Sequence, residues 1–332
     1  MILNFEQIKA MTVGAEKVTY DGEYYKFFRF SDKEETAAPD MLMKYTAGVW
    51  IECKTDATAL KLKVRVSDPV SVRTYFSFDI FKNSALVGTL QNLPEESRVG
   101  NYTIIPCALG EFESEIYLGD GDGEVKILLP HSLIGEIQKI ELIGATYAEP
   151  ILRDKLYIAI GDSITQGYDA LHPSSTYTYK IADMLSARCI NKAIAGAIFN
   201  PRLLAAAEEH NPDYVSVAYG TNDWSMLQRD VFIKNATEFF DILVEKYPNA
   251  QISVISPVWR GDSCVITAMG EFPIASAILQ DICEKHPRLK FIEGLDLIPH
   301  EPEMYGDLIL HPSDEGFKHY FEGLEKQIFD VK

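Results

Sequence analysis

The chain has 332 residues, of which 47% are hydrophobic and 24% charged, the balance of a globular protein with one large or two ordinary domains. With 49 acidic against 31 basic residues, the formal net charge is −18. A surface this acidic repels nucleic-acid phosphates and anionic lipid headgroups, and no Lys/Arg-rich run offsets it locally. We therefore expect no nucleic-acid or membrane partner, and favour neutral small molecules as ligands.

The five cysteines are widely scattered and form no CxxC pair, which is typical of reduced thiols in a cytoplasmic protein. The first residues have no basic start followed by an apolar core, so they do not resemble a secretory signal. No stretch reaches the roughly 20 apolar residues of a membrane helix. The sequence therefore predicts a cytoplasmic location.

Up to about residue 150, hydrophobic residues recur with the period of two expected of β-strands. Apolar and basic side chains alternate over residues 59–66, and similar alternation returns at 75–80, 125–129 and 140–142. Turn-rich pieces separate these runs, and no amphipathic helix is evident. This pattern predicts an all-β, jelly-roll-like sandwich domain over residues 1–152.

From about residue 153, short apolar runs alternate with segments of helix length. Strand-like runs are expected at residues 156–160, 189–195, 214–220, 252–256 and 289–294. Helical spacing is expected at residues 177–187, 201–210, 231–246, 271–286 and after Pro312. Apolar strands that are each followed by a helix indicate an α/β domain over 153–332, with a parallel sheet covered on both faces.

Small and polar residues follow the predicted strands of this second domain. They are GDSITQG at 161–167, AGA at 195–197 and GTND at 220–223, and DLILHP at 307–312 precedes the last helix. Because functional loops of a parallel α/β sheet gather at the carboxyl ends of its strands, we expect these segments to share one rim. Together they carry Ser, Gly, Asn and His, the components of an acyl-transfer site.

In the right order, GDSITQG, Gly196, GTND and HPSDEG at 311–316 resemble the four sequence blocks of the SGNH (GDSL) hydrolase family. The resemblance covers about residues 155–320. It implies a flavodoxin-like three-layer α/β/α sandwich and a serine esterase that works through an acyl-enzyme.

A serine hydroxyl needs a base to become nucleophilic at neutral pH, and imidazole titrates in the right range. We therefore expect Ser163 to be the nucleophile and His311 its base. The resemblance implies that the N–H groups of Ser163 and Gly196 and the side-chain amide of Asn222 form the oxyanion hole. Alternatively, Ser163 caps a helix or lines a phosphate-binding loop, and Asn222 is a turn residue.

The acid of a catalytic triad departs from the family pattern. Family members usually place an Asp three residues before the histidine, where this chain has Leu308. We expect Asp307 to be the acid if a bulged loop brings it to the ring, with a Ser-His dyad oriented by a main-chain carbonyl as the alternative. Asp162 and Asp223 are expected to brace their loops.

Neither a metal nor a cofactor is predicted. The run at 119–124 resembles a calcium loop only faintly, since it lacks the required glycine and glutamate, and a hairpin turn explains it better. Trp224 and Trp259 follow strand ends and are expected to line an acyl or sugar pocket, with ordinary packing as the alternative.

A β-sandwich ahead of an SGNH domain is similar to the arrangement of some carbohydrate esterases. The first hypothesis is therefore a serine esterase that removes short acyl groups, acetyl above all, from carbohydrates or other small-molecule esters. Two alternatives stay open: an acyltransferase that uses the same residues, and a non-catalytic carbohydrate-binding protein with a vestigial site.

Overall fold

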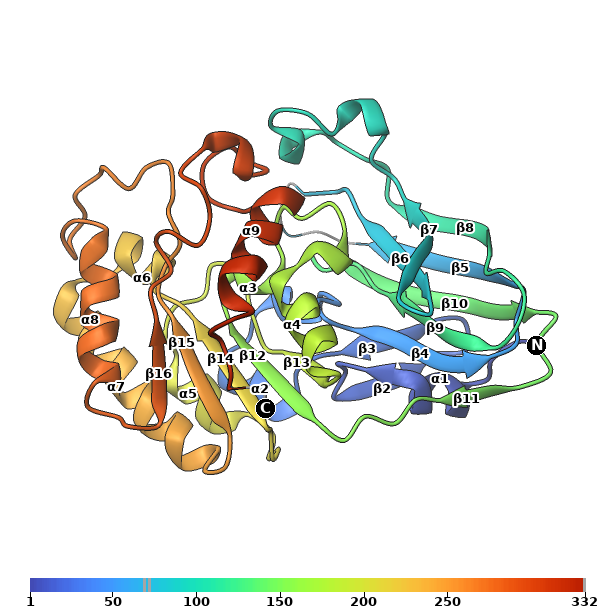
Figure 1. The fold of residues 1–332 in the computed structure, drawn as a ribbon, viewed down its shortest axis with the longest axis horizontal. Coiled ribbons are helices and arrows are strands. Elements are labelled where there is room, and N and C mark those ends of the chain that lie inside the picture. Colours follow the sequence, from blue (N-terminus) through green and yellow to red (C-terminus); the bar gives the residue numbers. More distant parts are fainter. Residues whose placement is uncertain (68–69, 71–72, 331–332) are drawn as a thin grey trace.

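A computed structural model describes residues 1–67, 70 and 73–330. Residues 12–150 build two antiparallel sheets and residues 156–292 build one parallel sheet, which lies beside them (Figure 1). Among the described residues, no helix has the length and apolar character needed to cross a bilayer.

The first antiparallel sheet has the order β2 (Lys17–Tyr20), β3 (Tyr25–Phe28), β10 (Ile134–Ile143), β5 (Ala59–Ser67) and β8 (Gly110–Tyr117). The second has the order β1 (Thr12–Val13), β4 (Trp50–Thr55), β9 (Gly123–Leu128), β6 (Ser77–Lys82) and β7 (Ala85–Gln91), and β11 (Ala148–Pro150) pairs with β4. Apolar side chains of both sheets fill one core between them, and the alternation predicted for residues 59–66 is confirmed. Helices α1 (Phe5–Met11) and α2 (Asp32–Ala37) flank this part.

The parallel sheet has the order β13 (Arg188–Asn191), β12 (Leu156–Gly161), β14 (Tyr214–Ala218), β15 (Gln251–Ile255) and β16 (Leu289–Ile292). This is the 2-1-3-4-5 order of flavodoxin-like sheets, so the parallel α/β sheet predicted from the sequence is confirmed. One face is covered by α5 (Pro201–Ala206), α7 (Arg229–Lys246) and α8 (Pro273–Cys283), and the other by α4 (Tyr177–Leu185) and α9 (Asp314–Leu324) (Figure 1).

The core around α4 and α9 is shared with the sandwich. Val13, Trp50 and Leu128 of the second antiparallel sheet belong to the same apolar cluster as Tyr177 and Phe317 of these two helices. The two parts of the chain are therefore joined by continuous apolar packing.

Arg29 adds a polar link between the two parts. Its side chain is fully buried (0% exposed) and donates to the carbonyl oxygens of Tyr45, Asn191 and Ala193 at 2.5, 2.7 and 2.9 Å. Two of these acceptors lie at the end of β13 and just after it, so a residue that follows β3 fixes the start of the loop that leads to Gly196.

We predict that Arg29→Met lowers the free energy of unfolding by about 3 kcal/mol or more, because it leaves several buried carbonyl groups without a donor. Urea unfolding measures the change. Arg188→Met, which alters an exposed arginine on β13, is the control and should cost less than about 0.5 kcal/mol. Equal stabilities of the two variants would contradict this role of Arg29.

Candidate active site

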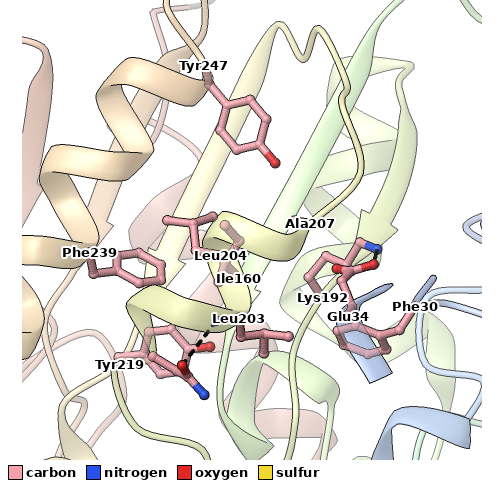
Figure 2. Close-up of a pocket in the computed structure, with 11 residues that line it drawn as sticks. Phe30, Glu34, Ile160, Lys192, Leu203, Leu204, Ala207, Tyr219, Phe239 and Tyr247 are labelled. Carbon is pink, nitrogen blue, oxygen red and sulfur yellow. Dashed lines mark hydrogen bonds and ion pairs between the residues drawn. The ribbon is translucent and has the colours of Figure 1, made fainter. Parts of the chain in front are cut away.

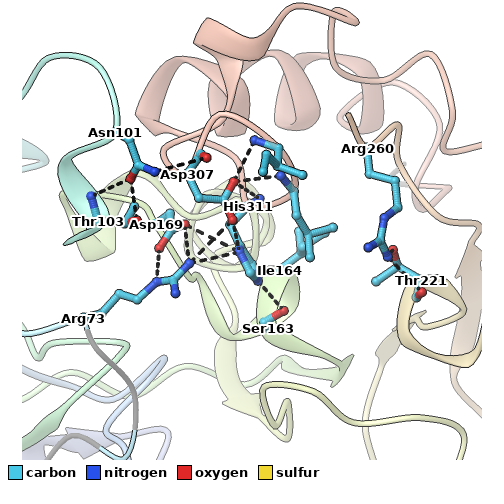
Figure 3. Close-up of polar contacts among 12 residues, drawn as sticks. Arg73, Asn101, Thr103, Ser163, Ile164, Asp169, Thr221, Arg260, Asp307 and His311 are labelled. Atoms are coloured by element: carbon cyan, nitrogen blue, oxygen red, sulfur yellow. Dashed lines mark hydrogen bonds and ion pairs between the residues drawn. The ribbon is translucent and has the colours of Figure 1, made fainter. Parts of the chain in front are cut away.

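Ser163 and His311 meet at the carboxyl edge of the parallel sheet. Ser163 begins the short helix α3 (Ser163–Gln166) directly after β12, and His311 lies on the loop before α9. Ser163 Oγ lies 2.8 Å from His311 Nε2, although 148 positions separate the two residues in the chain (Figure 3). The cap of α3 is Asp162, whose Oδ1 accepts the N–H of Ile164 at 3.0 Å, so the hydroxyl of Ser163 is not used for capping.

Asp307 reaches the other side of the imidazole. Its Oδ2 lies 2.7 Å from His311 Nδ1, and its Oδ1 accepts the backbone N–H groups of Ile309, Leu310 and His311. Leu308 has φ = 65°, a left-handed conformation that bends the loop and brings an acid four residues before the histidine up to the ring. Although burial opposes it, the hydrogen bonds from His311 and the backbone hold the pKa of Asp307 well below its usual range.

A second carboxylate, Asp169, faces the same ring nitrogen and was not anticipated from the sequence. It is fully buried, and its Oδ2 lies 3.5 Å from His311 Nδ1. The guanidinium of Arg73 binds it in bidentate fashion, with Nε 2.9 Å from Oδ1 and Nη2 3.0 Å from Oδ2 (Figure 3). Tyr75 donates its hydroxyl to Oδ1 at 3.0 Å.

Asp169, Asp307 and His311 are also the described residues whose side chains could gather around a metal ion, with ligand atoms within 4.8 Å of one another. The guanidinium of Arg73 already contacts all three of them, at 2.9 Å from Asp169, 3.5 Å from Asp307 and 3.4 Å from His311. Arg73 therefore supplies positive charge at the place that a metal ion bound by these three side chains would occupy.

Two side-chain amides link the other predicted segments to one another and to the helix of Ser163. Gln166 Oε1 accepts the N–H of Ala195 at 2.8 Å, and Asn222 Nδ2 donates to the carbonyl of Ala197 at 3.0 Å. Gly196, between these two contacts, has φ = 76°, a conformation that favours glycine. Asn222 lies on α6 (Thr221–Met226) directly after β14, so the three strand-end loops form one connected rim.

Asp223 braces this rim, as predicted. Its Oδ1 accepts the N–H of Phe199 at 3.1 Å, while its Oδ2 has no hydrogen-bond partner within the described part of the chain. Burial raises the pKa of Asp223 to about 7, and burial likewise raises the pKa of Asp162 to about 6.

The two tryptophans differ in their surroundings. Trp224 is 1% exposed, packs edge-on against Phe272 and donates its indole N–H to the carbonyl of Gly270 at 3.0 Å, which fits the packing alternative. Trp259 is partly buried and stacks on His300, with ring centroids 5.3 Å apart.

A pocket of about 20 Å³ lies between α5 and the sheet, and Ser163 is not among the residues that line it (Figure 2). It is lined mainly by apolar side chains, among them Ile160, Leu204 and Phe239, with the ion pair of Lys192 and Glu34 to one side. This volume is enough for about one water molecule and too small for an acyl chain.

Comparison with known proteins assigns the second part of the chain. Residues 159–319 match the model of the GDSL-like Lipase/Acylhydrolase family. The match runs from β12 into α9 and includes Ser163, Gly196, Asn222 and His311. No match is found among curated protein sequences.

Three solved structures resemble nearly the whole chain. A salicylyl-acyltransferase from a tetracycline biosynthetic pathway is 20% identical with a TM-score of 0.75, covering 95% of this chain and 93% of its own. A family two carbohydrate esterase from Clostridium thermocellum is 16% identical with a TM-score of 0.61, covering 86% and 92%. An acetyl xylan esterase from the rumen bacterium Butyrivibrio proteoclasticus is 13% identical with a TM-score of 0.62, covering 98% and 96%. At these identities, the likeness establishes a shared fold.

We predict that Asp223→Asn makes the GDSL-like part more stable at pH 8 than the unchanged chain, by up to ~4 kcal/mol, but not at pH 4. A folded-state pKa of about 7, against an ordinary 3.8, means that the stability contributed by the protonated acid is lost as the pH rises through 7. Asparagine keeps the oxygen that accepts the N–H of Phe199 and carries no charge.

Urea unfolding of both proteins between pH 4 and 8 measures the difference. Asp120→Asn, in an exposed turn, is the control and should leave the pH dependence unchanged. A stability difference that stays constant over this range would contradict the assignment to Asp223.

Proposed function

We propose that the chain is a serine ester hydrolase that removes short acyl groups, acetyl above all, from carbohydrates or other small-molecule esters. The observation that carries this proposal is the continuous contact from Ser163 Oγ to His311 Nε2 at 2.8 Å and from His311 Nδ1 to Asp307 Oδ2 at 2.7 Å. An imidazole accepts a proton at Nε2 only when Nδ1 carries the hydrogen, and a carboxylate at Nδ1 favours that tautomer.

The proposed reaction has two stages. Ser163 Oγ attacks the acyl carbonyl while His311 takes its proton, and His311 then returns that proton to the departing alcohol oxygen. Water, activated in turn by His311, cleaves the acyl-enzyme to the free acid. The N–H groups of Ser163 and Gly196 and the amide of Asn222 would stabilise the negative oxygen of each tetrahedral intermediate. The linked loops that carry these donors support this role.

For the acid we propose Asp307, which makes the site a triad. Asp169 is already bound to two guanidinium nitrogens of Arg73, Nε and Nη2, and of the two carboxylates Asp307 makes the shorter contact with the ring. The backbone N–H groups on its Oδ1 fix the carboxylate with Oδ2 directed at His311.

Two independent features support the substrate class. Two of the structural neighbours named above are esterases of carbohydrates or xylan, and the formal charge of −18 favours a neutral ester over an anionic one. The likeness to a salicylyl-acyltransferase favours the second candidate function, acyl transfer to an acceptor other than water.

The architecture ahead of the hydrolase part is proposed to be a jelly-roll domain that ends near residue 152. The strand orders β3-β10-β5-β8 and β4-β9-β6-β7 support it, because two Greek keys distribute eight successive strands between two sheets in this way. The cytoplasmic location stays a prediction, and the five free cysteines fit a reducing compartment.

Ser163→Ala and His311→Ala should each lower the hydrolysis of p-nitrophenyl acetate and acetylated sugars by about 10⁴-fold or more, because the nucleophile and its base act as one unit. The assay is a screen of acetylated sugars and nitrophenyl esters of increasing acyl length. Ser276→Ala, on α8 and paired with Glu293, is the control and should keep full activity. Ester turnover that survives Ser163→Ala would remove the proposal.

Asp307→Asn should lower kcat by about 10²–10⁴ with little change in KM, because the amide favours the wrong imidazole tautomer. Steady-state kinetics on the best ester of the screen measures both constants. A loss of less than about tenfold would favour the Ser-His dyad oriented by a main-chain carbonyl.

Product analysis separates hydrolysis from acyl transfer. The reaction is run with candidate acceptor alcohols, and new esters are sought by mass spectrometry. Formation of free acid alone would remove the support for transfer, whereas a Ser163-dependent ester product would favour it. An absence of any Ser163-dependent turnover would leave carbohydrate binding as the remaining function.

A further inference from the structure

We propose that the β-sandwich takes part in catalysis through Arg73, a positioning residue that balances the charge of two carboxylates beside the base His311. This inference rests on the proposed function, because it assigns a role in the same reaction. It concerns the half of the chain that lies outside the family match at residues 159–319.

Arg73 comes from the segment between β5 and β6 and crosses from the sandwich into the GDSL-like site (Figure 3). Its side chain is 17% exposed, and it makes two parallel contacts with the fully buried Asp169 at 2.9 and 3.0 Å. The same Nη2 lies 3.5 Å from Asp307 Oδ2 and 3.4 Å from His311 Nδ1. A planar guanidinium suits such a site, because it holds one carboxylate with two bonds and still reaches a second.

The negative charge beside His311 explains why the position of the Arg73 guanidinium matters. Two carboxylates face His311 Nδ1 at 2.7 and 3.5 Å, and without a nearby cation they would favour the protonated ring. A protonated imidazole cannot accept the proton of Ser163. Although burial opposes it, the bond to Asp169 raises the pKa of Arg73, so the guanidinium keeps its charge at every working pH.

The remaining titratable groups near the imidazole and its acids come from the segment around Ser163 and from the sandwich. Asp162 precedes the nucleophile, and the ring of Tyr168 lies with its centroid 5.6 Å from that of His311. Tyr75 and Tyr102 approach Asp169 from the sandwich side. Arg73 is the cation that the structure places in direct contact with this group of acids within its described residues.

The sandwich also holds the backbone of the acid loops. The hydroxyl of Tyr102 donates to the carbonyl of Asp169, a residue with φ = 68°, and the amide of Asn101 donates to the carbonyl of Asp307 at 3.5 Å. A left-handed conformation is unfavourable for aspartate unless its surroundings hold it. Residues of the first half therefore fix both carboxylates against His311.

The test compares pH profiles of kcat/KM for Arg73→Gln, Asp169→Asn and the double variant, on an ester whose hydrolysis depends on Ser163. Arg73→Gln should move the acid limb to higher pH by about one unit, which is a tenfold loss of activity below the limb. Asp169→Asn removes a negative charge and should move the limb to lower pH. The double variant should return it close to its original position.

Arg153→Gln is the matched control. Arg153 makes the same bidentate contact with a buried carboxylate, Glu52, at 2.8 and 3.0 Å, but it precedes β12 whereas Ser163 follows that strand. This variant should lose stability without a shift of the acid limb. Arg73→Lys keeps the positive charge and should keep the limb within a few tenths of a unit.

The outcomes separate this inference from the proposed function. If the unchanged chain shows no Ser163-dependent turnover, the proposed function fails together with this inference. If turnover depends on Ser163 but Arg73→Gln and Asp169→Asn lower it equally at every pH, the inference is overturned and the proposed function stands. If Arg73→Gln fails to fold, the two other variants test the inference. Asp169→Asn should move the acid limb to lower pH, and Arg73→Lys should leave the limb in place. The inference is overturned if either result is not obtained.

Discussion

The site depends on one imidazole that must hold two hydrogen bonds in opposite directions. His311 contacts Asp307 at 2.7 Å within its own loop, whereas its contact with Ser163 at 2.8 Å joins residues 148 positions apart. Ser163 is placed by the end of β12, whereas His311 is placed by the loop that packs onto α9. Parallel strands solve this problem because their carboxyl ends gather on one edge, where short loops bring distant residues within bonding distance. Hydrogen bonds from Gln166 and Asn222 then link the loops along that edge.

A buried acid–base pair brings an electrostatic cost that the surrounding structure must offset. Asp162, Asp169, Asp223 and Asp307 all lie near this edge, and burial raises the pKa of Asp162 and of Asp223. Where acids crowd together, charge is balanced either by protonation or by a cation. Asp223 follows the first course with a pKa of about 7, and Asp169 follows the second through Arg73. Both solutions limit the negative charge that the acids bring to this edge of the sheet.

The sequence was sufficient to predict the parts of the site that follow strand ends, because apolar runs locate the strands and the residues after them share one rim. It was also sufficient to predict the strand at residues 59–66, where the alternation of apolar and basic residues sets which side chains face the core. It did not reveal Asp169, which lies six residues after Ser163 with no motif of its own, or Arg73, whose partner is 96 positions away. The reach of Asp307 depends on the left-handed Leu308, a conformation that leucine rarely adopts and that propensity cannot predict. The burial of Trp224 likewise follows from tertiary packing against Phe272.

These contacts make the sandwich more than a neighbouring module. Trp50 and Leu128 share a core with α4 and α9, so removing the sandwich would expose the apolar face on which the His311 loop rests. Arg29 satisfies carbonyl groups where β13 leads into the loop of Gly196, and Arg73 contacts the acids themselves. A parallel sheet of this kind could keep its strand order without the sandwich, but the loops that carry its chemistry would lose buried hydrogen bonds on both sides of Ser163. The unit that holds the acid–base geometry is therefore the whole chain, although the family match covers only residues 159–319.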